Sequence, residues 1–379
     1  MKKFSFVFAL AILLAAATVK AQPAGTGWSQ FRGDAAQRGV ASALPEKLEL
    51  LWQAEVPGGI EATAAIESDA QGRGSVYVGG LGGKFLAYDL ENGAVRWTYE
   101  TGGEEIKSSP LLAAGSLYFG DEAGKLHALD AKTGKLRWSF MAEGPITGGP
   151  NFADGVLVVG SYDNRIYGLA AKDGKELWRL ETAGYVNGTP AISGKTVISS
   201  GCDGTLRLLD LKTGKQLAEA PVGTYVAASP AVDGSLAVFG TFDNDVVAFD
   251  LAKKAIVWRY KNPQREFPYY SSAALANGLA ILGGRDKALH AIDLKTGQGR
   301  WMKNFAARID ASPVIAGDQV YVADHAGVLA GFKLADGAET FRYESGEDFA
   351  ASPAIGGGKL LIGSVQGKLY AFGSPRKSP

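Results

Sequence analysis

Few side chains in this 379-residue chain could do chemistry: it has three His and a single Cys, Cys202. His127 and His290 occupy the same place in two copies of one phrase, "LHALD" and "LHAID", which indicates a structural role. His325, in "ADHAG" beside Asp324, is the one His whose expected turn position suits a site. A Ser–His–Asp triad would usually place its serine in a G-x-S-x-G turn, and no such motif supports one here.

Metal and phosphate chemistry find equally little support. Calcium takes about six to eight oxygen ligands, and the richest stretches, "SYDNR" (161–165) and "TFDND" (241–245), fall where Asp and Asn are ordinary turn formers. One Cys excludes an intramolecular disulfide and a Cys-based zinc site. The glycines of "VGGLGG" (78–83) precede an expected strand, so they lack the helix N-terminus that binds phosphate. We therefore predict no catalytic, cofactor-binding or metal-binding residues.

The elements that would position any site come from a repeat. "LHALDAKTGKLRW" (126–138) returns as "LHAIDLKTGQGRW" (289–301), and looser copies recur along the chain at a pitch of about 40 residues. That pitch fits propeller blades or helical repeats. Short alternating apolar runs broken by Gly and Pro exclude long helices and predict an all-β chain.

Each unit contains four expected strands. In the third unit these are Ile146–Phe152, Val156–Gly160, Ile166–Ala170 and Leu177–Leu180. The D-x-x-T-G turn places Gly where a hairpin needs a positive φ and Asp where it can bond to turn amides. One large side chain per unit would fill the gap between neighbouring sheets. The aligned positions are Trp52, Trp97, Trp138, Trp178, Leu217, Trp258, Trp301 and Phe341.

Seven full units end at Phe341, and an eighth lacks its fourth strand. The stretch "LELLWQAEV" (48–56) is a spare fourth strand at the opposite end of the chain. We therefore predict an eight-bladed β-propeller of four-stranded antiparallel blades over residues 48–373, closed by the N-terminal strand completing the last blade. Residues 22–47 would form a lead-in arm packed on the rim, and residues 374–379 a polar tail.

The N-terminus has the layout of a secretory signal peptide, assigned to residues 1–21. Lys2 and Lys3 precede an apolar run from Phe4 to Val19, which small residues follow. The run is about 16 residues, shorter than the roughly 20 that span a bilayer, and no Cys stands near the cleavage point. We predict an exported, periplasmic or extracellular monomer without a transmembrane or lipid anchor. Zero formal net charge argues against nucleic-acid binding.

The candidate binding residues are those that vary at otherwise repeated positions. One position, just before the small residues of each first strand, should face the axial channel; its occupants are Glu61, Lys107, Thr147, Asn187, Ala227, Tyr270, Asp310 and Ala350. A second ring, at the turns between second and third strands, includes Asp121, Glu122, Tyr162, Arg285, Asp324 and His325. We select Glu61, Lys107, Thr147, Asn187, Tyr270, Asp310, Arg285 and His325 as channel or partner-binding candidates. The alternative is a channel filled only with water.

The phrase at Ala128–Trp138 resembles the PQQ-like propeller repeat, named after the pyrroloquinoline-quinone (PQQ) alcohol dehydrogenases. In size, blade number and export signal the chain is most similar to the BamB-type propellers of outer-membrane protein assembly. That resemblance implies a non-catalytic scaffold that binds a protein or peptide partner in the cell envelope.

Two other functions remain open at this stage. Quinoprotein relatives usually hold PQQ beneath two adjacent Cys, with a calcium ion and an Asp base. A single Cys here means that no cofactor is expected, so a PQQ-dependent oxidoreductase would need an atypical site. A small-molecule or carbohydrate sensor would use the channel ring. An arc of aromatic residues there would favour sugars, and Tyr270 is the one aromatic the sequence places in it.

Overall fold

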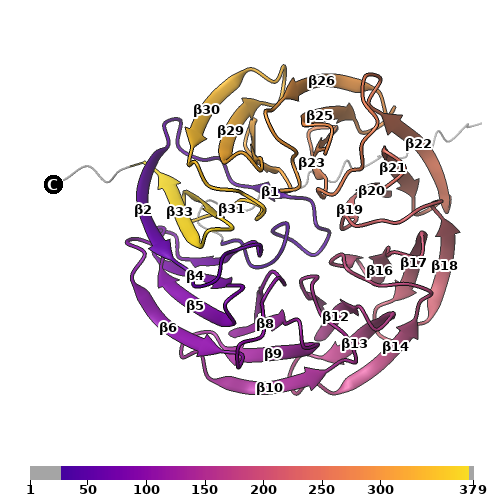
Figure 1. The fold of residues 1–379 in the computed structure, drawn as a ribbon. Helices are drawn as coiled ribbons and strands as arrows, with labels where there is room; N and C mark the ends of the chain where they lie inside the picture. Colours follow the sequence, from indigo (N-terminus) through magenta and orange to yellow (C-terminus); the bar gives the residue numbers. More distant parts are fainter. Residues whose placement is uncertain (1–26, 375–379) are drawn as a thin grey trace, which may run out of the picture.

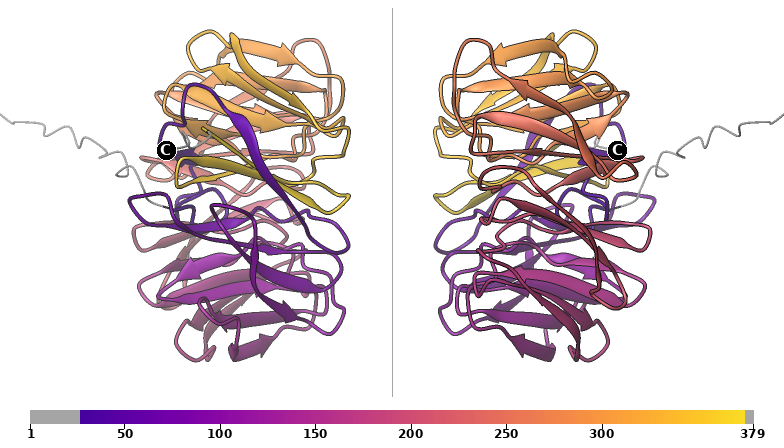
Figure 2. Two further views of the ribbon diagram at one scale, coloured as in Figure 1. Left: turned by 90° about the vertical axis from the view of Figure 1, so that its left-hand side faces the viewer. Right: turned by 90° about the vertical axis from the view of Figure 1, so that its right-hand side faces the viewer.

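The computed structural model describes residues 27–374, and the predicted signal peptide and most of the polar tail lie outside that range. Strands and turns are the only regular structure in the described range. They form eight sheets arranged as blades around a central axis (Figure 1), and edge-on the blades make a thick disc (Figure 2). The predicted all-β, eight-bladed propeller is confirmed.

Within blades 1–7 the strands run from the axis outward in chain order, and in blade 8 the outermost strand comes from the N-terminal part of the chain. The innermost strands of blades 1–8 are β3 (Ala65–Ser68), β7 (Leu111–Ala113), β11 (Asn151–Ala153), β15 (Ala191–Ser193), β19 (Ala231–Asp233), β23 (Ala274–Ala276), β27 (Val314–Ala316) and β31 (Ala354–Gly356). The second strands are β4 (Gly74–Gly79), β8 (Ser116–Gly120), β12 (Val156–Ser161), β16 (Thr196–Ser199), β20 (Leu236–Gly240), β24 (Leu279–Gly283), β28 (Gln319–Ala323) and β32 (Lys359–Gly363).

The third strands form the buried middle of each blade, and the outermost strands are exposed on alternate residues. The third strands are β5 (Lys84–Asp89), β9 (Lys125–Asp130), β13 (Arg165–Ala170), β17 (Thr205–Asp210), β21 (Asp245–Asp250), β25 (Ala288–Asp293), β29 (Val328–Lys333) and β33 (Lys368–Gly373). The outermost strands are β6 (Val95–Glu100), β10 (Leu136–Met141), β14 (Glu176–Glu181), β18 (Gln216–Pro221), β22 (Ala255–Lys261), β26 (Gly299–Asn304), β30 (Glu339–Glu344) and, in blade 8, β2 (Glu49–Glu55).

The ring closes as predicted. Strand β2 pairs antiparallel with β33, with Trp52 opposite Ala371, so the N-terminal strand completes the blade that begins with β31. Closure leaves no blade missing its outer strand. In blade 3, three of the four predicted strands match to within one residue. The first does not: β11 starts at Asn151, and residues 146–150 form a loop that runs along the channel.

In six of the eight blades the repeated phrase joins the blade to the next one through a Trp–Gly contact, here called the lock. Trp138 donates its indole N–H to the carbonyl of Ala171 in the following blade, at 3.1 Å. Its ring packs on Gly174, where a Cβ would lie only 2.4 Å from the Trp138 ring. Gly174 also has a φ of 73°, which disfavours a side chain, and the Trp138 ring excludes one. Equivalent indole–carbonyl bonds come from Trp52, Trp97, Trp178, Trp258 and Trp301.

The alignment at blade 4 was wrong by one residue. Ala218, opposite Leu208, occupies the place that Trp178 holds opposite Gly168, whereas Leu217 is 45% exposed. This blade therefore has no large side chain at the lock. In the turn that faces it, the usual Gly is replaced by Lys254, which keeps the left-handed φ of 54°. The turn can carry a side chain because no ring packs there.

The lead-in arm lies across the axis rather than on the outer rim (Figure 1). Its carbonyl groups accept main-chain N–H groups from the innermost strands of five blades: Ser29 from Leu112, Ala35 from Ile192, Ala36 from Val232, Arg38 from Leu275 and Gly39 from Ile315. Strand β1 (Val40–Ala41) then pairs parallel with β27. The prediction of rim packing was wrong because the inner strands present unpaired N–H groups at the axis, and the arm satisfies them.

Candidate functional site

A ring of inter-blade hydrogen bonds forms the wall of the channel. The Ser or Thr before the Pro or Ala of each inner segment accepts the main-chain N–H of its counterpart in the preceding blade. The bonds run from Thr63 to Ser109, Gly149 to Thr189, Thr189 to Ser229, Ser229 to Ser272, Ser272 to Ser312 and Ser312 to Ser352, at 2.8–3.0 Å. Gly149 interrupts the ring because it has no hydroxyl. The repeated "SP" and "TP" pairs could have revealed this ring from the sequence.

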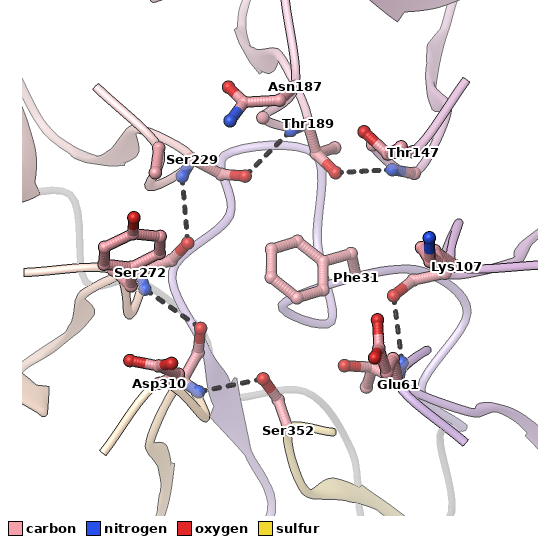
Figure 3. A pocket seen from close by; sticks show the side chains of 18 residues that line it. Phe31, Glu61, Lys107, Thr147, Asn187, Thr189, Ser229, Ser272, Asp310 and Ser352 are labelled. Atoms are coloured by element: carbon pink, nitrogen blue, oxygen red, sulfur yellow. Dashed lines mark hydrogen bonds between the residues drawn. The ribbon is translucent and has the colours of Figure 1, made fainter. Parts of the chain in front are cut away.

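The predicted variable position does line the channel, but it lies in the loop before each inner strand rather than within it. Glu61, Lys107, Thr147, Asn187 and Asp310 all border one axial cavity of about 180 Å³ (Figure 3). Ala227 and Tyr270 border the cavity as well, whereas Ala350 does not. The residue of blade 8 that lines the cavity is Ser352.

Phe31 of the arm occupies the middle of this ring (Figure 3). The arm bonds to Leu112 and Ile192, each three residues beyond the ring Ser109 and Thr189, so it covers one end of the channel. The cavity is therefore bounded by the arm at one end. The other end of the cavity lies at the opposite face of the propeller. This face carries the inter-blade loops and the turns between second and third strands, and we call it the loop face.

Four of the candidate residues meet in one charged cluster on the loop face, at blades 6–8. Arg285 pairs with Asp310 through two N–O contacts of 2.9 Å. Its guanidinium also stacks on the ring of Tyr270, 3.3 Å from the centroid. His325 donates from Nε2 to Asp310 at 3.2 Å, and its Nδ1 lies 2.7 Å from Asp348. This second contact is an ion pair.

The cluster shifts the titration of both central groups. Burial alone would raise the pKa of Asp310, but hydrogen bonds from His325 and Arg285, with their positive charges, outweigh it and lower the pKa to about 2. The hydrogen bond to Asp310 raises the pKa of His325, burial opposes this, and Asp348 adds to it. Asp310 is thus an anion held by cations on either side.

The opposite side of the mouth, at blades 1 and 2, is acidic. Lys107 Nζ lies 3.1 Å from Glu105 and 3.5 Å from Glu122, and Glu61 is also close enough to act on its charge. Thr147 and Asn187 stand between this side and blade 5. Their Oγ1 and Oδ1 atoms are buried and have no hydrogen-bond partner in the described part of the chain.

Two members of the predicted second ring do not face the channel. Asp121 and Asp324 are buried and accept main-chain N–H groups within their own turns. Asp121 also accepts from His127 Nε2 at 2.7 Å, while Tyr99 donates to Nδ1 of the same ring at 3.1 Å. Blade 6 repeats this arrangement with Asp286, His290 and Tyr260. The structural role predicted for His127 and His290 is confirmed.

The loop face carries an aromatic arc that the sequence analysis missed. Tyr162 stacks on Tyr185 with centroids 4.9 Å apart and planes 3° apart. Tyr225 contacts Phe242 at 6.0 Å, and Phe242 contacts Tyr270 at 4.8 Å. Tyr185 and Tyr225 are 50% and 58% exposed. At the variable channel position Tyr270 is the one aromatic residue, and the arc extends from it onto the neighbouring loops. Tyr185 and Tyr225 hold equivalent repeat positions, two residues before Asn187 and Ala227, so alignment of the loops could have found them.

Within residues 27–374, no three His, Cys, Asp or Glu side chains group so that they could hold a metal ion. The Asp residues of the repeated turns are instead engaged locally. Asp130, for example, accepts the N–H groups of Lys132 and Thr133 and pairs with Arg137, which helps lower its pKa to about 2.

The blade count, the ring closure and the repeated Trp–Gly turn define the class of this protein: it is a PQQ-like propeller. More narrowly, the family model of the outer membrane protein assembly factor BamB matches residues 37–121, 103–264 and 242–375. These matches cover most of the chain, so the protein belongs to the BamB family.

Individual relatives are distant. The BamB of Moranella endobia (strain PCIT) is 22% identical over 132 residues, which is 35% of this chain and 33% of that protein. The alignment thus spans about a third of the relative. The crystal structure of BamB from Moraxella catarrhalis superposes with a TM-score of 0.73 at 19% identity, covering 88% of this chain and 99% of that one.

The same fold occurs in enzymes. Quinohemoprotein alcohol dehydrogenase from Comamonas testosteroni superposes with a TM-score of 0.79 at 14% identity, covering 93% of this chain and 82% of that chain. At such identities the superpositions show a shared fold and nothing more. No helix in residues 27–374 is long and apolar enough to cross a bilayer.

Proposed function

We propose that this protein is a non-catalytic, exported scaffold of the cell envelope that binds a protein or peptide partner through its loop face. The observation that carries the proposal is the family membership, because the matching family model is described as an outer membrane protein assembly factor. The loop face supports it: exposed Tyr185 and Tyr225 lie beside a charged cluster. Aromatic side chains and Arg are the residues most enriched at binding hot spots.

The residues of the axial cavity do not fit PQQ. The cavity, about 180 Å³, is smaller than the roughly 300–1,000 Å³ of pockets for drug-sized ligands, and Phe31 stands in its middle. The chain has one Cys, so the paired Cys of quinoprotein relatives cannot form. We therefore assign no redox step to this chain, and we propose that it acts in the periplasm or outside the cell as a monomer.

The test is site-specific photo-cross-linking in the native envelope. A benzophenone amino acid replaces Tyr225 on the loop face or, as the control, Met141 on outer strand β10; the two are equally exposed at 58%. We expect position 225, and not position 141, to cross-link to a component or a client of outer-membrane protein assembly. Saturable quenching of Trp fluorescence by PQQ with calcium, together with no cross-link at position 225, would overturn the proposal.

A further inference from the structure

We infer that the mouth of the axial channel is a binding site for a neutral oligosaccharide, with one sugar ring in the cavity above Phe31 and the next along the aromatic arc. This site goes beyond the proposed partner-binding function and does not depend on it. Three features of the loop face carry the inference: the cavity lining, the charge balance and the geometry of the aromatic rings.

The cavity lining is nearly all polar and is rich in both donors and acceptors. Each hydroxyl of the Ser/Thr ring that accepts a main-chain N–H keeps its own O–H to donate. Thr147 Oγ1 and Asn187 Oδ1 are buried without a partner in the described chain, which is costly unless a ligand or water satisfies them. A sugar ring, with several hydroxyl groups that both donate and accept, is complementary to such a lining.

The size and charge of the cavity favour a neutral ligand. At about 30 Å³ per water molecule, its volume of about 180 Å³ equals that of a few waters and suits a single small ring. Most of the charged groups around it are paired, Asp310 with Arg285 and His325, and Lys107 with Glu105 and Glu122, and Glu61 adds a further acidic side chain that disfavours anions. A strongly charged ligand would have to compete with these pairs, whereas hydroxyl groups can bond to them without displacing a charge.

The aromatic arc extends the site outward from the cavity. Tyr270 borders the cavity, and contacts with Arg285 and Phe242 fix its ring. Tyr225 and Tyr185 follow with half-exposed rings. Exposed, immobilised aromatic faces bind the C–H faces of sugars at low entropic cost, since a Tyr has only two side-chain torsions to fix. An extended peptide would use several pockets for alternate side chains, whereas the channel offers a single polar cavity.

The experiment uses the purified mature protein and three probes: maltotetraose, cellotetraose and N-acetylchitotetraose. Saturation-transfer NMR identifies binding, and calorimetry gives the dissociation constant. The variants are Tyr185→Ala and Tyr225→Ala on the arc and Asn187→Ala in the cavity. Met141→Ala, on outer strand β10 and as exposed as Tyr225, is the control. All four side chains are at least partly exposed, so each variant should fold, and circular dichroism checks this.

We expect at least one tetrasaccharide to bind, and each arc or cavity variant to weaken it about tenfold, which corresponds to about 1.4 kcal/mol. Met141→Ala should bind like the parent protein. Two results would overturn the inference: no binding of any probe at millimolar sugar, or binding that all three site variants leave unchanged. Binding of an extended peptide that Tyr225→Ala abolishes, with no sugar bound, would assign the surface to proteins instead. The cross-linking at position 225 tests the partner separately.

Discussion

The missing Trp between blades 4 and 5 allows a quantitative test of the inter-blade lock. Ala218 stands where six other blades place a Trp, and Lys254 occupies the facing turn where Gly is otherwise required. We consider three variants: Ala218→Trp, Lys254→Gly and the double variant. If ring and glycine form one unit, the two substitutions must be strongly coupled.

The magnitude follows from the intact locks. Trp178 is 7% exposed and bonds to the Leu211 carbonyl at 2.9 Å. Burying a ring of that size in place of Ala contributes roughly 3 kcal/mol after side-chain ordering is subtracted. The hydrogen bond adds about 1 kcal/mol. With Lys254 present, its Cβ would stand where a Cβ at Gly214 would meet the Trp178 ring at 2.5 Å. Ala218→Trp alone should therefore cost about 1–3 kcal/mol from overpacking.

We expect Lys254→Gly alone to change the free energy of unfolding by less than about 1 kcal/mol, because release of the left-handed strain and gain of chain entropy offset each other. The double variant should gain about 2–4 kcal/mol, giving a coupling energy of at least about 2 kcal/mol. Guanidinium denaturation measures this, provided that the m-value is unchanged and that fluorescence and circular dichroism give the same transition. Gly297→Lys, at the intact Trp258 lock, is the control and should destabilise. Additivity within about 0.5 kcal/mol would refute the idea of a Trp–Gly unit.

Three further predictions concern buried and charged groups. Asp286→Asn should lower the unfolding free energy by about 2–4 kcal/mol, because it removes the charged acceptor of buried His290; thermal denaturation measures this, and sugar or partner binding should not change. The raised pKa of His325 stabilises the fold fully below about pH 6.5 and less as pH rises through that pKa. His325→Asn should therefore lower Tm at about pH 6 and not at about pH 9, and equal losses at both would contradict this. Phe31→Ala should cost about 1–3 kcal/mol yet keep the arm's main-chain bonds; rapid tryptic cleavage at Arg32 would show instead that the arm has detached.

The eight-bladed architecture could be predicted from the sequence because one pattern recurs in every blade. A single hairpin such as 126–138 is ambiguous alone, but its recurrence fixed the strand count, and the unmatched strand containing Trp52 then implied the closure. The error at Leu217 arose where the pattern is weakest. Without a Trp to anchor the alignment, the pattern favours Leu217, the larger apolar residue, whereas the lock position is Ala218.

Only the site residues that lie at repeated positions could be predicted from the sequence. The variable position led to Glu61, Asn187 and Asp310, because symmetry places equivalent residues on one ring. It could not place Phe31, since the arm lies outside the repeat and its position depends on inner-strand N–H groups that only the closed ring aligns. It also could not show that Arg285 and His325 converge on Asp310, because these contacts cross blade boundaries.

The arm covers one end of the channel, so the proposed sugar and the proposed partner would both bind on the loop face. Because the arm bonds to the inner strands of five blades and Phe31 stands in the ring, a ligand can reach the cavity only from the loop face. A sugar seated against Tyr225 would therefore occupy part of any partner surface centred on that residue. A saturating tetrasaccharide that binds should reduce photo-cross-linking at position 225 by at least about fivefold, the effect expected of 1 kcal/mol of competition. Partner copurification with the control variant at Met141 should fall in parallel. Unchanged cross-linking in saturating sugar would mean that partner and sugar use separate sectors of the loop face, and the charged cluster of Arg285, Asp310 and His325 would then be the sector to probe next.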